Sequence, residues 1–213
     1  MSSEATAGAT LSALDEATRA LVRLSAVLAS GTEEDVRAEL QRAMNTTSHE
    51  WIEELLLQTY LFAGFPRALN GMREWRRVSG RPPIATATRM SDEEIRRRGE
   101  RTCARVYGDM YERLRVNIRE LHPLLDEWMI LEGYGKVLGR PELDLERREL
   151  CIVAACAATA QDRQLQSHLH GARNVGVAER VLTDTLQSLA DVVPDPLLAR
   201  ATRLWNRIRN DVH

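Results

Sequence analysis

The chain has 213 residues, 44% of them hydrophobic, and its 29 basic and 31 acidic residues give a formal net charge of −2. This length supplies enough apolar material for one large domain or two small ones. The small negative charge leaves no electrostatic footprint for nucleic acid, so we expect no nucleic-acid partner. No apolar run approaches the roughly 18–20 residues that a membrane helix needs, so we expect no membrane insertion either.

Two features of the sequence indicate the compartment. The N-terminal stretch "MSSEATAGAT" lacks a basic segment followed by an apolar one, so a secretory signal is not expected. The three cysteines, Cys103, Cys151 and Cys156, show no Cys-x-x-Cys spacing and no even disulfide framework. An odd number of cysteines without such a framework is typical of a reducing compartment. We therefore predict a cytoplasmic protein.

Hydrophobic periodicity predicts an all-α protein, because apolar residues recur at spacings of three and four and no stretch alternates cleanly. "TSHE" from Thr47 and "SDEE" from Ser91 have the form of capping boxes, which mark helix starts. Pro66 follows the breaker Gly64 at a position where a first helical turn tolerates proline. The predicted helices, in chain order, cover about 15–30, 33–46, 48–62, 92–104, 108–119, 123–138, 144–159, 161–175 and 178–191.

The sequence repeats itself at an offset of 129 residues. "LDEATRAL" falls on "LDLERREL" without a gap, and between Leu14 and Gln58 12 of 45 positions are identical to their counterparts. A shared helical period does not explain matched Asp, Arg and Asn residues, so we predict two tandem copies of one helical unit. The predicted division is a disordered tail at 1–10, a first unit at 11–79, a linker at 80–91, and a second unit with its lead-in helices at 92–213.

These motifs resemble the carboxymuconolactone decarboxylase family, which includes the alkylhydroperoxidase D-like proteins. The resemblance rests on "LDLERREL" and "QDRQLQSHLHGARNVG" in the second unit, "LLLQTYLFAGFPRALN" in the first, and the lead-in "LHPLLDEWMILEGYGKVLGRPELD". It covers about 14–72 and 92–190, and it implies the all-α alkylhydroperoxidase D-like fold, present twice. Family members with one unit commonly form rings of six units, so the resemblance implies a homotrimer of double units.

The resemblance also assigns site residues. The family's two redox cysteines fall on Gln161 and Gln164, and glutamine supplies neither a thiolate nor a resolving thiol, so dithiol peroxidase activity is not expected. The family's proton-carrying glutamate falls on Glu149 and its histidine on His168. Spacings of three and four place Gln161, Gln164 and His168 on one helical face, whereas His170 points elsewhere.

A carboxylate that faces an imidazole can hold and deliver a proton. We therefore expect an acid–base enzyme of the decarboxylase (lyase) or isomerase type, acting on a small carboxylate or lactone. In the decarboxylase branch of the family, the dienolate left after loss of CO₂ must be protonated. Arg148 and Arg173 are the candidate cations for a charged substrate, Gln161 and Gln164 are further substrate-binding candidates, and Tyr134 could overhang the pocket. Neither a metal ion nor another cofactor is expected.

A second function class remains open, a non-catalytic small-molecule binder or assembly scaffold in which Glu149 and His168 form only a buried hydrogen-bonded pair. A pocket at this pair would favour the enzyme, and a packed, dry site would favour the binder. The corresponding positions of the first unit are Ala20 and Glu39. The acid–base site is therefore expected in the second unit alone.

Overall fold

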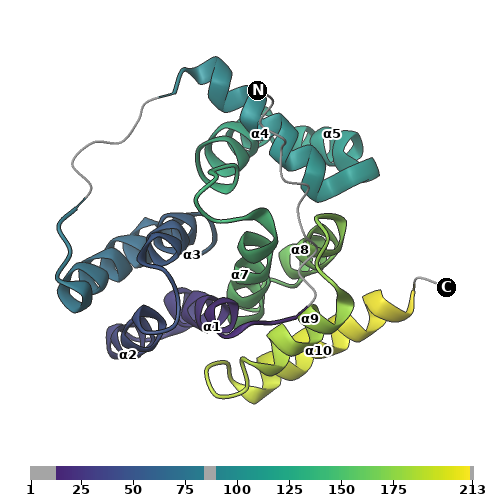
Figure 1. The fold of residues 1–213 in the computed structure, drawn as a ribbon. Coiled ribbons are helices and arrows are strands. Elements are labelled where there is room, and N and C mark those ends of the chain that lie inside the picture. Colours follow the sequence, from purple (N-terminus) through teal and green to yellow (C-terminus); the bar gives the residue numbers. More distant parts are fainter. Residues whose placement is uncertain (1–12, 84–89, 212–213) are drawn as a thin grey trace, which may run out of the picture.

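The computed structural model describes residues 13–83 and 90–211, and these residues form helices and no strand, which confirms the all-α prediction. The predicted tail at 1–10 and part of the predicted linker, 84–89, lie outside the described residues. Figure 1 shows the arrangement of the helices. In chain order they are α1 (Glu16–Ser30), α2 (Glu33–Met44), α3 (His49–Ser79), α4 (Asp92–Tyr107), the 3₁₀ turn η1 (Gly108–Met110), α5 (Tyr111–Leu121), α6 (Pro123–Trp128), the π-helix η2 (Met129–Leu138), α7 (Leu145–Ala158), α8 (Asp162–Asn174), α9 (Glu179–Gln187) and α10 (Asp195–Asn210).

Side-chain caps start several of these helices. The capping box predicted at Ser91 is confirmed, because its side chain accepts from the Glu94 N–H and the Glu94 side chain accepts from Ser91. The box predicted at Thr47 is wrong by one residue, since the cap of α3 is Ser48, whose hydroxyl accepts from the Trp51 N–H. Thr47 still belongs to the turn that ends α2, with its N–H donated to the Ala43 carbonyl, so it cannot adopt the extended cap conformation.

Helix α3 bends at Gly64, whose φ of 81° lies in the left-handed region that favours glycine. Pro66 then stands in the first turn of the segment after the bend, as its fixed φ allows. The predicted helix at 48–62 corresponds to the part before this bend. The part that continues to Ser79, which buries Trp75, was not predicted, and neither was α10.

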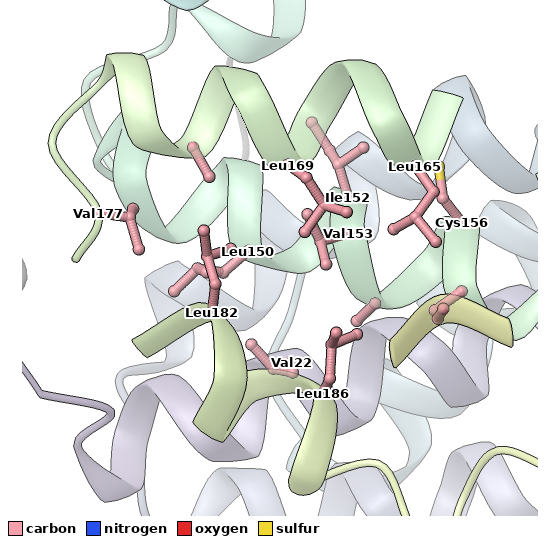
Figure 2. Packing of buried hydrophobic residues seen from close by; sticks show 14 of the residues in the cluster. Val22, Leu150, Ile152, Val153, Cys156, Leu165, Leu169, Val177, Leu182 and Leu186 are labelled. Carbon is pink, nitrogen blue, oxygen red and sulfur yellow. The ribbon is translucent and has the colours of Figure 1, made fainter. Parts of the chain in front are cut away.

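Helix α7 lies at the centre of the molecule, with α1 and α8 beside it (Figure 1). Twelve of its 14 residues are buried. Figure 2 shows Leu150 and Val153 of α7 packed with Leu169 of α8 and Leu182 of α9. Burial of such aliphatic side chains is the main stabilising contribution to a helical core, and it fixes α7 and α8 against each other.

The first two helices of each half begin at corresponding positions, because α7 and α8 start 129 residues after α1 and α2. Two corresponding residues also touch, since Arg147 Nε donates to Thr18 Oγ1 at 2.8 Å. Contacts between corresponding residues are typical of a local two-fold axis. Among the described helices, none is both long and apolar enough to span a membrane.

Candidate acid–base site

Glu149 on α7 and His168 on α8 face each other in the interior. The Nδ1 atom of His168 lies 2.8 Å from Oε2 of Glu149. Glu149 is 0% exposed and His168 3% exposed. The chain reverses between the two helices at Ala160, which adopts a positive φ of 56°, and this tight turn brings the pair together. The two residues predicted as an acid–base pair are therefore in hydrogen-bonding contact.

The second carboxylate oxygen of Glu149 is unusual. Oε1 is buried and has no hydrogen-bond partner among the described residues. A buried acceptor without a partner costs about 1–3 kcal/mol of desolvation, and most native proteins avoid it. An acceptor therefore stays free beside the imidazole, where a substrate group or a proton could be held.

Two neighbours close the pair off from solvent. A Cβ atom on Gly171 would lie 2.7 Å from Glu149 Oε2, so only glycine lets the α8 backbone approach the carboxylate this closely. On the other side, the Phe62 ring stands edge-on to the His168 ring, with centroids 5.5 Å apart and an interplanar angle of 85°. Phe62 lies two residues before the bend of α3 at Gly64.

Tyr134 and Tyr107 form a pair of phenols whose pKa values are both raised by the Glu149 charge. Their rings meet edge to face at 6.2 Å, and their hydroxyls are hydrogen-bonded to each other. Burial first, and then the Tyr107 and Glu149 charges, raise the pKa of Tyr134 well above its usual value, so this phenol remains protonated. Tyr134 thus lies buried in the core, whereas the sequence suggested that it could overhang a pocket.

The cysteines near the site are inert thiols. Burial, assisted by the Asp126 and Glu149 charges, raises the pKa of Cys103 to about 12, and burial assisted by the Glu149 charge raises the pKa of Cys156 to about 12. Burial raises the pKa of Cys151 to about 12 as well. All three cysteines are free and buried. Because the thiolate is the reactive form, these side chains are poor nucleophiles at neutral pH.

Arg148, a candidate cation for the substrate, is fully buried and already paired. Its Nη2 atom lies 2.7 Å from Glu54 Oε2, and Glu54 also binds Arg140 at 2.8 Å. Gln58 donates to the Arg148 carbonyl at 3.0 Å. The Arg148 guanidinium therefore joins α7 to α3, and its charge is balanced there.

The other substrate-binding candidates lie nearer the surface. Arg173 is half-buried and forms an ion pair with Glu179, N to O 3.1 Å. Gln161, the N-cap of α8, and Gln164 are exposed. Their spacing puts both glutamines on the His168 face of α8, towards its solvent-exposed start rather than at the buried pair.

A groove of about 710 Å³ runs along a different face of α8. Its walls come from α8, the end of α4, η1 and α5, and His170 is one of the lining residues. Glu149 and His168 do not line it, although Gly171 separates the groove from the Glu149 carboxylate. Sequence reasoning did not find this groove. The available signal was the spacing of Arg163, Ser167, His170 and Asn174, which places them on one face.

Comparison with known proteins identifies the segment that carries the pair. Residues 124–207 match the sequence profile of the family described as "Carboxymuconolactone decarboxylase family". This segment is similar to the carboxymuconolactone decarboxylase family. The matched residues, termed the CMD segment, run from α6 into α10 and include both Glu149 and His168.

Two curated relatives are similar over a longer stretch. "Peroxisomal protein 2" of Schizosaccharomyces pombe is 30% identical over 132 residues, which cover 60% of this chain and 62% of that protein. "Peroxisomal protein 2" of Saccharomyces cerevisiae is 24% identical over 168 residues, which cover 66% of this chain and 59% of that protein. The chain thus spans about three fifths of the length of these relatives.

The first half of the chain lies outside the CMD segment and is bonded differently. Glu39, which corresponds to His168, is 4% exposed and forms ion pairs with Arg23, at 3.1 Å, and with Arg42. Ala20, which corresponds to Glu149, has no ionisable group. Within residues 13–83 and 90–211, no group of three or more His, Cys, Asp or Glu side chains is placed to hold a metal ion.

Proposed function

We propose that this protein is an acid–base enzyme acting on a small carboxylate or lactone, with Glu149 and His168 as the proton-carrying couple. The observation that carries the proposal is the 2.8 Å contact between His168 Nδ1 and Glu149 Oε2, with Glu149 Oε1 left free. The couple lies in the CMD segment, and the family name of that segment describes a decarboxylase.

The proposed chemistry is a proton transfer at carbon. In a decarboxylation, the bond between the ring carbon and the carboxylate breaks, CO₂ leaves, and the electron pair stays on the ring as a dienolate. Protonated His168 donates its proton to this carbon, and solvent then restores the proton. Glu149 orients the imidazole and stabilises its charged form, as a carboxylate partner does for a catalytic histidine. In an isomerisation the same couple removes a proton and returns it.

Substrate entry requires movement, because His168 is 3% exposed. We propose that Phe62 is the side chain that moves, since it stands edge-on to the His168 ring and lies two residues before the bend at Gly64. Exposed Gln161 and Gln164, on the same face of α8 as His168, would then border the entrance.

The experiment measures solvent-deuterium incorporation and CO₂ release in deuterium oxide, with carboxymuconolactone and a panel of small lactones and unsaturated carboxylates as substrates. His168→Asn and Glu149→Gln are expected to lower turnover by about 10²–10⁴-fold, the usual contribution of general acid–base catalysis. The matched control is Glu39→Gln, which alters the corresponding buried position of the first half and should leave turnover unchanged. Turnover that survives in His168→Asn, or wild-type protein that transforms no member of the panel, contradicts the proposal.

A second candidate is a non-catalytic small-molecule binder. It is favoured by the fact that the groove beside α8 is lined by neither Glu149 nor His168. In that case the pair only holds α7 to α8, and His168→Asn lowers the melting temperature without changing any turnover. The deuterium experiment with parallel melting curves separates the two candidates.

We further propose that the chain is a tandem duplication that assembles as a homotrimer. The equal spacing of the helix starts supports the duplication. Exposed apolar side chains such as Phe65, at 62%, and Leu121, at 73%, support self-association. Light scattering should give three times the chain mass of 24.1 kDa, and a clean monomer mass would overturn the trimer.

For location, we propose the cytoplasm, on the grounds of the three free, buried cysteines. The relatives are named as peroxisomal proteins, which makes the peroxisome the competing outcome. Fractionation of the source cells with antibody detection decides between the two compartments.

A further inference from the structure

The groove beside α8 has the size of a small-molecule site. Its volume of about 710 Å³ falls in the range of roughly 300–1,000 Å³ that is usual for ligand pockets. It lies between α8 and α5, a helix with no fully buried residue. This groove is separate from the Glu149–His168 couple, so ligand binding in the groove does not depend on the proposed function.

The two ends of the groove carry opposite charges. Arg163 lies in the first turn of α8, and its guanidinium forms no ion pair with any residue that the structure describes. Asp109 lies at the other end, next to Gly108, which adjoins Asn174 at the end of α8. Asn174 lies eleven positions after Arg163 on α8, which corresponds to a rise of about 16 Å along the helix.

The position of Arg163 in α8 does not stabilise that helix. The first turn of a helix carries the positive end of its dipole, which favours acidic residues and disfavours arginine. An anion at this end would interact favourably both with the guanidinium and with the helix dipole. The charge of Arg163 is therefore available for a ligand.

The remainder of the lining is suited to an apolar body. Met110 and Leu114 form the accessible part of the wall opposite α8, whereas Val106 is 0% exposed. Tyr107 lies on the same side and has its hydroxyl committed to Tyr134, so it offers mainly its ring. Burial and the nearby Arg173 charge lower the pKa of His170, which therefore meets a ligand at neutral pH as an uncharged hydrogen-bonding group.

We propose that this groove binds a small, elongated organic acid, with its carboxylate on Arg163 and its apolar body against Met110 and Leu114. The chemical class is a medium-chain aliphatic acid or an arylalkanoic acid, since both combine one anionic end with an apolar body.

The experiment uses the fluorescence of anilinonaphthalene sulfonate, an amphipathic anion, on the full-length protein. Decanoate and phenylacetate are titrated as competitors, with decanol and phenylethanol as their uncharged counterparts, and the relative potency of the two acids tells the aliphatic source from the aromatic one. We expect the acids to displace the probe at least tenfold more effectively than the alcohols. Arg163→Ala should weaken the acids at least tenfold and leave the alcohols unchanged.

Matched variants locate the binding on the surface. Leu114→Asp, within the groove, should weaken the acids and the alcohols alike, whereas Val116→Asp, an exposed position on the same helix outside the groove lining, should weaken neither. Arg203→Ala removes an exposed arginine from α10 and should bind the acids and the alcohols as the wild type does. The proposal is overturned if alcohols compete as well as acids or if Arg163→Ala binds normally. It is also overturned if the groove is covered by a second copy, seen as a wild-type oligomer that excludes the probe and that Leu114→Asp dissociates.

Discussion

Replacing Arg148 with methionine should destabilise the protein, because this guanidinium is the buried link between α7 and α3. It donates to Glu54 Oε2 at 2.7 Å, to the Leu143 carbonyl at 3.0 Å, to the Arg140 carbonyl at 3.2 Å and to Gln58 Oε1 at 3.4 Å. Methionine fills a similar volume but can donate to none of these acceptors, of which Glu54 alone keeps a second arginine, Arg140.

The loss of stability depends on the ion pair that Glu54 keeps after Arg148 is replaced. Removal of one partner from a buried ion pair costs about 3–5 kcal/mol, and the low end applies because Arg140 still binds Glu54 at 2.8 Å. About 3 kcal/mol corresponds to a fall of about 6–12 °C in melting temperature for a chain of this size. Thermal melts followed by circular dichroism at neutral pH measure this directly.

The same variant should change the response to acid. Burial alone would raise the pKa of Glu54, but hydrogen bonds from Arg140 and Arg148 outweigh it and hold the pKa below the ordinary value of 4.5. A carboxyl group whose pKa is lowered by folding stabilises the folded state at pH values above its pKa in the unfolded chain. This stabilisation is lost as the pH falls through its pKa in the folded protein. The gap in melting temperature between wild type and Arg148→Met should therefore narrow below about pH 4.

The control is Arg97→Met, which breaks an exposed ion pair with Glu93 at 3.5 Å and should cost about 0–1 kcal/mol. If Arg148→Met melts as the control does, the structural role of Arg148 is refuted. If it also loses turnover, Arg148 belongs to the substrate site, as the sequence suggested.

Three further outcomes are expected. Gly171→Ala should cost about 1–3 kcal/mol of stability and lower turnover, because the new methyl group collides with the Glu149 carboxylate. The control Gly133→Ala should be neutral, because nothing lies within 4 Å of the added methyl group. Equal melting temperatures of the two variants would contradict the packing at Gly171. Ser48→Ala should cost about 1 kcal/mol as a lost helix cap and Thr47→Ala much less, and the reverse order would return the cap to Thr47. The three buried thiols should not react with a thiol-reactive disulfide reagent at about pH 8 until the protein is unfolded, and rapid reaction of the folded protein would contradict their burial.

The helices were largely predictable because hydrophobic period and cap chemistry are local properties of the chain. The segment after Gly64 was missed because a positive-φ glycine is typical of the end of a helix, although Pro66 restarts one at once. Helix α10 lies beyond the internal repeat, so the repeat could not indicate it. The N-cap of α3 is Ser48 and not Thr47 because the Thr47 N–H donates to the Ala43 carbonyl at the end of α2, so Thr47 still belongs to the turn that ends α2.

The candidate site was predictable only in part, for a physical reason. Glu149 and His168 were paired because each occupies a motif position one helix from the other. The role of Arg148 depends on Glu54, which lies 94 residues away, and no local pattern encodes such a partner. The groove needs α5 to stand beside α8, an arrangement that depends on tertiary packing.

The most direct test of the central claim is a double-mutant cycle on turnover, with His168→Asn, Glu149→Gln and the double variant assayed on the same substrate. If the two residues act as one proton-carrying couple, the double variant should lose no more activity than the worse single variant, because each change alone already disables the unit. Losses that multiply in the double variant, or single variants that keep wild-type turnover, would contradict the account.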